Sequence, residues 1–324
     1  MEIKTVALIG AGAVGSYFVA GLKERLGENL WVIAEGERKE RLEKEGLWIN
    51  DQQIIPCVKT PQEAAGADLI LVSVKYGALK GILSWIETIA DEHTIVMSLL
   101  NGVDSEEIIG SRIGMEHMVY SLMKIASQRV ENQIRYDPEK TGGVFFGEKD
   151  RSNSERIQAL CRLFDGSGVR YRVCQDVMQD LWYKFSLNIS KNLPQAIINC
   201  GQGAYTESEH VAYISERLRL EVVAVAAAKG IDIHDADAPA ARNSGILPTA
   251  RYSTLQDLDA HRPTEIDMFS GALIRMGKEL GMEVPFNEFA FHAIKALEEK
   301  NSGKICEICE CSVSGLLSGP GVRI

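Results

Sequence analysis

The sequence predicts an α/β Rossmann-like domain at the N-terminus, followed by an all-α domain. Three observations support this prediction. Short apolar runs alternate with amphipathic stretches in the first half of the 324 residues, a glycine-rich loop follows the first apolar run, and long helical patterns dominate after about residue 175. Continuous apolar strands separated by helices are typical of a parallel sheet that is covered on both faces. We therefore expect one domain at residues 1–175 and a second at 176–324.

Short apolar runs mark the strands expected in the first domain, and amphipathic stretches mark its helices. The expected parallel strands are Thr5–Ile9, Leu30–Ala34, Leu69–Val74 and Thr94–Ser98, with helices such as Ser16–Leu26 and Arg38–Glu45 between them. Three further runs predict a meander that finishes the same sheet: Met118–Ile125, Gln133–Tyr136 and Gly143–Phe146. A helix at Arg156–Phe164 and a last strand at Val169–Val173 complete the domain.

Helical patterns make up the second domain. The expected helices are Met178–Asn192, His210–Lys229, Thr264–Leu280 and Asn287–Glu299. The stretch Thr206–Glu209 fits a capping box at a helix start, and Thr264 fits an N-cap with Glu265 in the first turn. Gly281 followed by Pro285 fits a helix stop.

Composition excludes several classes of partner. Hydrophobic residues make up 45%, charged residues 25%, and the formal net charge is −10, which argues against nucleic acid or an anionic membrane. The chain shows no apolar run of about 18 residues and no signal peptide at its start, so we expect no membrane span and a cytoplasmic protein whose seven cysteines are reduced thiols. Cys306, Cys309 and Cys311 could hold a metal if a fourth ligand came from elsewhere, and His234–Asp237 could also suggest a metal. We interpret the first as a cysteine cluster without a role and the second as a polar loop, so we expect no metal site.

The glycine-rich loop predicts a dinucleotide site. An apolar strand precedes the loop and a helix follows it, and its residues are Gly10, Ala11, Gly12, Ala13, Val14 and Gly15. The first glycine allows a tight turn, the second lets the backbone approach a pyrophosphate, and the third lets helix and strand pack closely. The helix start then offers free N–H groups to that phosphate. A purely structural turn between strand and helix is the alternative.

The residues leave the choice between NAD(H) and NADP(H) open. Glu35 follows the second strand, about twenty residues after the loop, where an acidic side chain usually holds the ribose 2′-OH of NAD. A carboxylate there should repel the extra phosphate of NADP. Arg38 and Lys39 follow within one turn, however, and could bind that phosphate.

Two polar residues stand at the ends of predicted strands. Lys75 follows one strand and Asn101 follows the next along the chain. Ligands of open parallel sheets bind at the carboxyl ends of the strands. We therefore expect both side chains to face the cofactor or the substrate, although either residue alone is more often an ordinary strand terminator.

A line of polar residues runs along one apolar helix. Lys184, Asn188 and Asn192 are spaced by four, so each lies only about 40° around the helix from the previous one. Leu181 and Phe185 lie on the same side, so this face is not simply exposed to water. Burying amides and a charge without partners costs several kcal/mol. Either a ligand or other protein groups must satisfy them, or the stripe is half-exposed.

Taken together, these residues resemble the ketopantoate reductase (2-dehydropantoate 2-reductase) family over nearly the whole chain. The matching motifs are the GAGAVG loop, the SVK strand end, the NG after the fifth strand, the W-x-K-x-x-x-N-x-x-x-N helix from Trp182, and an S-x-x-x-D…TEID segment. The resemblance implies reduction of 2-dehydropantoate to pantoate, for pantothenate and coenzyme A synthesis, in a cleft of the two domains. It also implies NADP(H) as cofactor and allows a homodimer formed through the helical domain.

The resemblance assigns a role to each polar residue. Lys184 matches the catalytic lysine that donates a proton, and Glu265 matches the active-site glutamate. Asn188, Asn192 and Ser253 match substrate-binding positions, whereas Asn101 and Lys75 match residues near the nicotinamide. Lysine has an ordinary pKa of about 10.4, so its ammonium can polarise a ketone and then protonate it. Uncharged amides can bind hydroxyl and carboxylate oxygens.

Two departures from the family pattern keep alternatives open. Glu35 stands where the family often has arginine, so NAD(H) is a near-equal alternative to NADP(H), and Leu100 stands where glutamine often precedes the asparagine. One alternative function is reduction of another branched 2-oxo acid on the same fold. Another is a non-catalytic NAD(P)-binding sensor.

Overall fold

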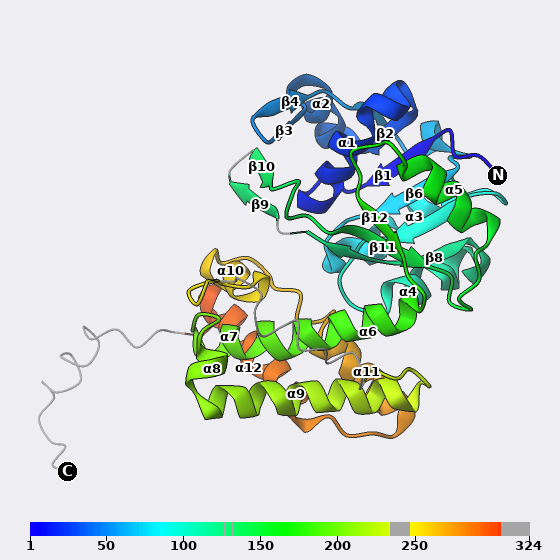
Figure 1. Ribbon diagram of the computed structural model, residues 1–324. Helices are drawn as coiled ribbons and strands as arrows, with labels where there is room; N and C mark the ends of the chain where they lie inside the picture. Colours follow the sequence, from blue (N-terminus) through cyan, green and yellow to red (C-terminus); the bar gives the residue numbers. More distant parts are fainter. Residues whose placement is uncertain (126, 131–132, 234–246, 306–324) are drawn as a thin grey trace, which may run out of the picture. The chain divides into compact units, whose positions relative to one another are not determined.

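The computed structural model describes residues 1–125, 127–130, 133–233 and 247–305, and they form two compact units (Figure 1). One unit consists of Met1–Ser186 with the described residues of Val222–Pro239. The other consists of Leu187–Glu221 with the described residues from position 247 onward. The histidine–aspartate stretch at 234–237 and the cysteines at 306, 309 and 311 lie outside the described residues.

The first unit is built on a mainly parallel sheet, as the sequence predicts. Its strand order is β12-β11-β8-β7-β6-β1-β2-β5, and the register is parallel from β5 through to β8. The strands are β1 Val6–Ile9, β2 Leu30–Ile33, β5 Cys57–Lys59, β6 Leu69–Val72, β7 Ile95–Ser98, β8 Met118–Lys124, β11 Gly143–Gly147 and β12 Tyr171–Val173. Strand β11 pairs antiparallel with β8 and parallel with β12.

Helices cover both faces of this sheet, because successive strand residues point to opposite sides. Val6 and Leu8 of β1 belong to one apolar core, and Ala7 and Ile9 belong to another. The first core includes residues of α1 and α5, whereas the second includes residues of α3 and α4. These helices, with α2, span α1 Ala13–Leu26, α2 Gly36–Glu45, α3 Tyr76–Ile89, α4 Ser105–Ile113 and α5 Glu155–Phe164.

The predicted meander at the end of the sheet is wrong in one respect. Strand β10 (Gln133–Tyr136) leaves the main sheet, and β8 pairs directly with β11. β10 instead joins a small second sheet of order β4-β3-β10-β9, where it pairs parallel with β3 and antiparallel with β9. Its other strands are β3 Leu47–Ile49, β4 Gln52–Ile54 and β9 Ser127–Val130. The partner strand β3 is remote in sequence, so no local sequence pattern predicts this pairing.

The helical run that begins the second half is longer than predicted. Helix α6 (Val177–Leu187) continues into a π-helical turn at Asn188–Asn192 and then into α7 (Leu193–Ile198). Pro194 suggests a helix end, because proline has no N–H to donate. It occupies the first turn of α7, however, where a backbone N–H has no partner within the helix. The run therefore ends at Asn199, whose backbone is left-handed.

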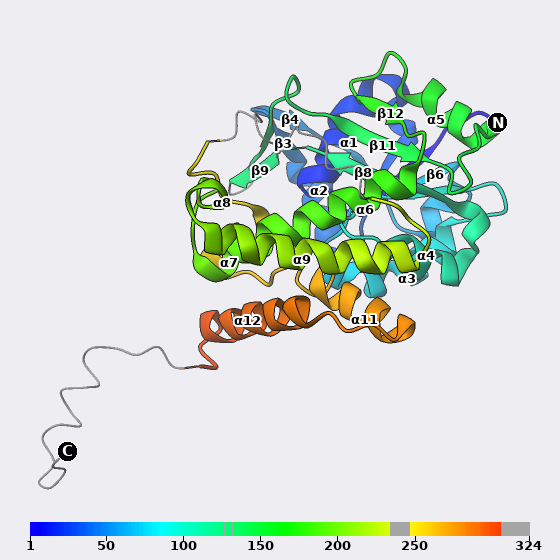
Figure 2. The same ribbon diagram turned by 60° about the horizontal axis from the view of Figure 1, so that its bottom comes forward.

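The remaining helices of the second half are α8 Ala204–Glu207, α9 Glu209–Ala228, α10 Ser253–Asp259, α11 Ser270–Leu280 and α12 Pro285–Asn301. Within the helical unit, α12 packs against α7, α10 and α11. Figure 2 shows α12 next to α11. Gly281 ends α11 in a left-handed conformation with φ of 67°, as expected for a helix stop. No helix in the described part of the chain is both long and apolar enough for a membrane span.

One predicted cap and one predicted helix start are wrong. Thr206 lies inside the short helix α8, and the hydroxyl that caps α9 belongs to Ser208, which accepts from the Val211 N–H at 3.4 Å. The helix predicted from Thr264 begins only at Ser270, because residues 265–269 form turns and Phe269 has a non-helical backbone. The polar groups of Thr264 bind a side chain on α12 instead of capping α11.

Candidate active site

The glycine loop between β1 and α1 has the geometry of a phosphate cradle. Gly10 has φ of 101°, and a side chain there would meet the backbone of Ser73 and Val74 at 2.8 Å. A Cβ on Gly15 would lie 2.0 Å from the Gly10 carbonyl oxygen. At Gly12, by contrast, a Cβ would meet nothing within 4 Å. The loop is thus tightly packed at its two ends and open at its middle, which is the side a ligand can approach.

Helix α1 offers its N-terminus to an anion. Its N-cap is Gly12, so no side chain caps the first N–H groups, and its first turn contains no acidic residue. Uncapped N–H groups and the positive end of the helix dipole favour phosphate. Ser73, at the end of β6, donates its hydroxyl hydrogen to the Gly10 carbonyl and so pins the loop. Ser73 is a contributor that the glycine pattern alone does not reveal.

Glu35 stands at the end of β2 as the N-cap residue of α2. Its side chain makes no capping hydrogen bond and the residue is exposed, so its carboxylate is available to a ribose. Lys39 on the next turn is engaged, because its ammonium lies 2.7 Å from the Glu63 carboxylate. This contact holds the pKa of Glu63 at about 2 and raises the pKa of Lys39. Lys39, which could attract a 2′-phosphate, is therefore already paired.

The strand-end residues Lys75 and Asn101 lie on neighbouring loops that a hydrogen bond joins. Lys75 is exposed at the N-cap of α3, directly before Tyr76. The Tyr76 hydroxyl donates to the Asp104 carboxylate at 2.6 Å, and Asp104 is the N-cap residue of α4. The loop that carries Asn101 is thus tied to the start of α3, as expected for neighbouring strands of one parallel sheet.

Lys184 reaches this edge of the sheet from α6. Its Nζ donates to the Asn101 Oδ1 at 2.7 Å, and both residues are partly buried. The contact joins residues 83 positions apart. The neutral amide orients the ammonium without neutralising it. Lys184 and Asn101 are therefore brought together within the first unit.

The buried carboxyl group of Glu106 belongs to a hydrogen-bond network beside the loop that carries Asn101. Glu106, in the first turn of α4, is 1% exposed, and burial raises the pKa of its carboxyl to about 8. Ser105 donates to Glu106 Oε2 at 2.8 Å, and the hydroxyls of Ser105 and Ser98 lie 2.7 Å apart. Ser98 ends β7, so this network links the strand to the helix on either side of Asn101. At neutral pH, Glu106 is a protonated hydrogen-bonding group.

We predict that Glu106→Gln stabilises the protein increasingly as pH rises from 5 to 8. The carboxyl titrates at 4.5 when unfolded and at about 8 when folded, so in this window the folded state holds more protons and stability falls as pH rises. That loss amounts to at most about 1.4 kcal/mol per pH unit. Because glutamine cannot ionise, the variant does not lose this stability as pH rises. Urea unfolding at pH 5, 6.5 and 8 measures the effect, with exposed Glu92→Gln as control; a pH-independent difference would contradict it.

In the helical unit, Asn192 and Ser253 lie together. The Asn192 Nδ2 is 3.4 Å from the Ser253 Oγ, and Asn192 is 7% exposed. Asn188 is half-buried, and its Nδ2 is a buried atom with no hydrogen-bond partner among the described residues. A buried amide donor without a partner costs free energy unless a ligand or water accepts from it. This cost favours a role in binding.

Gln195 is a site-supporting residue that the sequence interpretation misses. It is 0% exposed, and its Nε2 donates to the Ala250 carbonyl at 3.0 Å while its Oε1 accepts from the Tyr252 N–H. These bonds hold the segment that leads directly into Ser253. The spacing of polar residues could have revealed it, because Gln195 follows Asn192 by three and extends the polar stripe along the same helical run.

Glu265 is half-buried in the helical unit, between α10 and α11 along the chain. Its carbonyl oxygen accepts hydrogen bonds from the N–H groups of Met268 and Phe269, at 3.0 and 3.2 Å. The glutamate therefore sits in a turn rather than in the first turn of a helix.

Comparisons with known proteins match this chain to one family over most of its length. A sequence model of the family "Ketopantoate reductase PanE/ApbA" matches residues 6–150, and the corresponding C-terminal model matches residues 176–298. The chain is 25% identical over 305 residues to the 2-dehydropantoate 2-reductase of Archaeoglobus fulgidus, covering 92% of this chain and 99% of that protein. It is 24% identical over 300 residues to the enzyme of the same name from Streptococcus pyogenes serotype M1, covering 90% and 97%.

Solved structures share the fold over the same length. A PanE/ApbA family ketopantoate reductase from Ralstonia eutropha JMP134 is 27% identical, with a TM-score of 0.79 and coverage of 92% of this chain and 99% of that one. A D-mandelate dehydrogenase in complex with NADH is 24% identical, with a TM-score of 0.80 and coverage of 91% and 99%, and this likeness concerns the fold alone. With two family models matching consecutive parts of its length, this chain belongs to the ketopantoate reductase PanE/ApbA family.

Proposed function

We propose that the protein reduces 2-dehydropantoate to pantoate with a nicotinamide cofactor. The contact between the Lys184 Nζ and the Asn101 Oδ1, at 2.7 Å, carries this proposal. It places a charged proton donor at the loop that follows β7, and β7 belongs to the same parallel sheet as the glycine loop. Curated relatives named 2-dehydropantoate 2-reductase support the substrate.

The glycine loop fits a dinucleotide. Gly12 has open space around it, and the uncapped start of α1 can bind the pyrophosphate. When bound, the reduced nicotinamide supplies a hydride to the ketone carbon. The exposed Glu35 carboxylate can accept hydrogen bonds from ribose hydroxyls, and Lys75 is a further candidate contact at the end of β6.

Lys184 supplies the proton that balances the hydride. Its ammonium polarises the ketone oxygen, and a proton moves from Nζ to that oxygen as the carbon–oxygen double bond becomes a single bond. Asn101 holds the ammonium in place through a neutral hydrogen bond. In this proposal the negative charge of the Glu265 carboxylate balances the positive charge of the Lys184 ammonium.

The remaining polar residues bind the substrate oxygens. Asn188, Asn192 and Ser253 offer amide and hydroxyl hydrogens to a carboxylate and a hydroxyl group. The buried Asn188 Nδ2, which has no partner among the described residues, is suited to such an acceptor. Because these groups are uncharged, they can bind oxygens without displacing the proton on Lys184.

We expect Asn192→Ala to raise the KM for the 2-oxo acid by about 10- to 150-fold, because one hydrogen bond to a charged group is worth about 1.5 to 3 kcal/mol. The value of kcat should change much less if the contact is equal in the ground and transition states. Initial rates at saturating cofactor measure both constants. Exposed Asn29→Ala serves as control, and an unchanged KM would remove Asn192 from the substrate contacts.

NADH is the cofactor that the geometry of α2 favours. The Glu35 carboxylate is free to bind ribose, whereas Lys39 is paired with Glu63. The D-mandelate dehydrogenase of similar fold was solved with NADH, which shows that this fold accommodates that cofactor.

A second candidate substrate is a different 2-oxo acid. The fold also serves a D-mandelate dehydrogenase, solved in one structure with NADH and anilino(oxo)acetate. Values of kcat/KM for 2-dehydropantoate and for the aryl 2-oxo acid that corresponds to mandelate separate these candidates. Our proposal requires a higher value for 2-dehydropantoate, and a preference for the aryl acid would reassign the substrate. Cofactor binding without reduction of either acid would favour a sensor.

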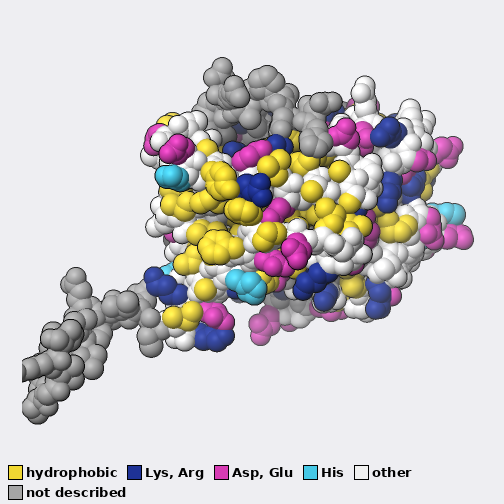
Figure 3. Space-filling model, turned by 90° about the horizontal axis from the view of Figure 1, so that it is seen from below, with side chains coloured by type: hydrophobic (Ala, Val, Ile, Leu, Met, Phe, Trp, Pro, Cys, Tyr) yellow, Lys and Arg dark blue, Asp and Glu magenta, His cyan; other side chains and the backbone are white. Residues whose placement is uncertain are grey.

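Assembly through the helical unit is a further part of the proposal. Figure 3 shows hydrophobic side chains gathered on one face. The exposed aromatic residues of the helical unit include Tyr213 at 60% and Phe289 at 67%. The ring of Tyr213 on α9 lies 6.4 Å from that of Phe286 on α12. A dimeric ketopantoate reductase from Staphylococcus aureus has a similar fold. Exposed aromatic side chains of this kind support a homodimer.

A further inference from the structure

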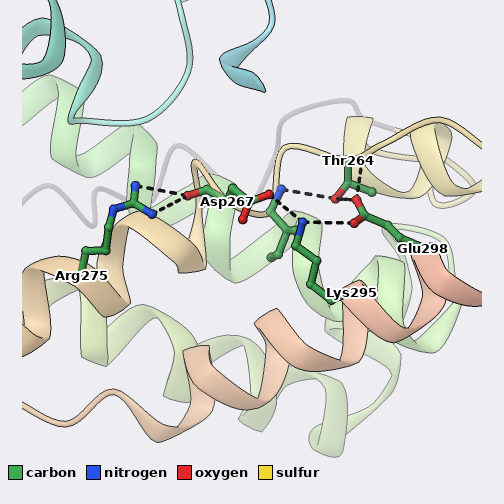
Figure 4. Close-up of polar contacts among 6 residues, drawn as sticks. Thr264, Asp267, Arg275, Lys295 and Glu298 are labelled. Atoms are coloured by element: carbon green, nitrogen blue, oxygen red, sulfur yellow. Dashed lines mark hydrogen bonds and ion pairs between the residues drawn. The ribbon is translucent and has the colours of Figure 1, made fainter. Parts of the chain in front are cut away.

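The turn that carries Glu265 is tied to helix α12 on both sides of that residue (Figure 4). On one side, Thr264 donates its N–H and its hydroxyl hydrogen to the Glu298 Oε1, at 2.7 and 2.6 Å. On the other side, the Lys295 Nζ donates to the Asp267 Oδ2 at 2.6 Å. Lys295 and Glu298 are also paired with each other at 3.3 Å, one helical turn apart. Glu265 is thus bracketed by contacts to two neighbouring residues of one helix.

The backbone of the turn leaves Glu265 little freedom. The Thr264 hydroxyl, while donating to Glu298, accepts from the Ile266 N–H at 3.3 Å and so bridges across Glu265. The Asp267 carbonyl accepts from the Arg275 guanidinium of α11 at 3.5 Å. Two amides also donate to the Glu265 carbonyl, and the Ile266 carbonyl accepts from the Gly271 N–H at 3.0 Å. These contacts fix the backbone from which the Glu265 side chain projects.

Helix α12 is itself held in place by hydrogen bonds and by buried side chains. The carboxylate of Glu221 accepts from the N–H groups of Phe286 and Asn287 in its first turn, both at 2.9 Å. Asn287 and Ile294 are 0% exposed, and Asn301 at the other end donates to the Leu258 carbonyl at 2.7 Å. Because α12 is held at its start, middle and end, its side chains can fix the position of the turn that carries Glu265.

The contacts to the turn differ in expected strength. The Glu298 side chain is 18% exposed and accepts two short hydrogen bonds, and charge-assisted bonds of this kind are among the stronger ones in proteins. The Lys295 side chain is 35% exposed, so its ion pair with Asp267 is partly screened by water. Glu298 should therefore matter more than Lys295.

We propose that Glu298, assisted by Lys295, is a positioning residue that holds Glu265 in its active orientation. This inference rests on the proposed function, because it gives Glu265 a part in the reduction of a 2-oxo acid. Neither Glu298 nor Lys295 is proposed to touch substrate or cofactor. Both act through Thr264 and Asp267, the residues that flank the glutamate and its following isoleucine.

The test is a double-mutant cycle with Glu265. We expect Glu298→Ala alone to lower kcat/KM for 2-dehydropantoate by about tenfold, with unchanged affinity for NADH. In a protein that already carries Glu265→Ala, the same change should lower kcat/KM less than about twofold, because there is no carboxylate left to position. If the two losses simply multiply, Glu298 acts independently of Glu265 and the inference is overturned.

Two matched variants sharpen the test. Glu298→Gln keeps an oxygen that can accept from Thr264, so it should retain most of the activity that Glu298→Ala loses. Glu288→Ala removes an exposed carboxylate from the first turn of the same helix and should leave kcat/KM unchanged. Equal losses in the glutamine and alanine variants would contradict a role through the Thr264 hydrogen bonds.

Hydrogen exchange decides the inference even if the protein reduces no 2-oxo acid, the result that would defeat the proposed function. We expect the amides of Ile266, Met268 and Phe269 to exchange about tenfold faster in Glu298→Ala than in the unsubstituted protein, because the turn loses its anchor. The amides of α9 should be unaffected. Unchanged exchange in residues 266–269 would overturn the inference whatever the substrate.

Discussion

Replacing Lys184 by alanine should lower kcat by roughly a thousandfold while cofactor affinity stays within about a factor of two. General acid catalysis typically contributes 10²–10⁴-fold, so removal of the proton donor should cost about 4 kcal/mol in the barrier. Because the proton moves only in the transition state, kcat and kcat/KM should fall together. Steady-state rates and a fluorescence titration with NADH measure the two quantities.

Lys191 provides the matched control. It lies on the same helical run, in the π-helical turn, with its Nζ 3.3 Å from the Ser215 Oγ and 4.6 Å from the Tyr205 ring centroid. Lys191→Ala removes an equal charge from the same run and should leave kcat near its original value. A primary amine added to Lys184→Ala should restore part of the rate. Equal losses in the two lysine variants would contradict a chemical role for Lys184.

Replacing Glu35 by arginine should shift the cofactor preference toward NADPH by at least about 30-fold in kcat/KM. The change replaces repulsion of a 2′-phosphate by attraction. Two charges about 4 Å apart interact by about 1 kcal/mol in water and about 4 kcal/mol near a protein surface, and each 1.4 kcal/mol is a factor of ten. Rates with both cofactors at fixed 2-oxo acid concentration give the ratio.

Two further variants separate the causes of this shift. Glu35→Ala removes the repulsion without adding a cation, so its ratio should lie between those of the unsubstituted protein and Glu35→Arg. Glu40→Arg makes the same charge change at an exposed position further along α2 and should move the ratio little. If Glu35→Arg leaves the ratio unchanged, Glu35 does not face the ribose.

Local patterns in the sequence sufficed for most of the fold. The strands of the parallel sheet are continuous apolar runs, so β1, β2, β6 and β7 lie within a residue or two of their predicted positions. Strand β10 joins a different sheet from the one that the sequence predicts, because its partner β3 lies far back in the chain. Thr264 resembles an N-cap because threonine before glutamate is typical of helix starts, but its partner Glu298 lies 34 residues further on.

The candidate site shows the same division between local and remote information. The spacing of Lys184, Asn188 and Asn192 indicated a polar stripe but not what it contacts. The structure supplies one partner, Asn101, across 83 residues, and a second pair, Asn192 with Ser253, across 61. Gln195 and Glu298 escaped prediction because each acts by holding another segment. Such roles depend on where distant segments meet, and single residues do not reveal that.

The most direct test of the central claim is the loss of nicotinamide absorbance when purified protein meets 2-dehydropantoate, run in parallel with NADH and NADPH. Our account predicts rapid loss that requires the 2-oxo acid, is faster with NADH, and nearly disappears in Lys184→Ala. Measurable binding of cofactor without any loss of absorbance would contradict the proposed reduction of 2-dehydropantoate. An undiminished rate in Lys184→Ala would contradict the assignment of that lysine as the proton donor.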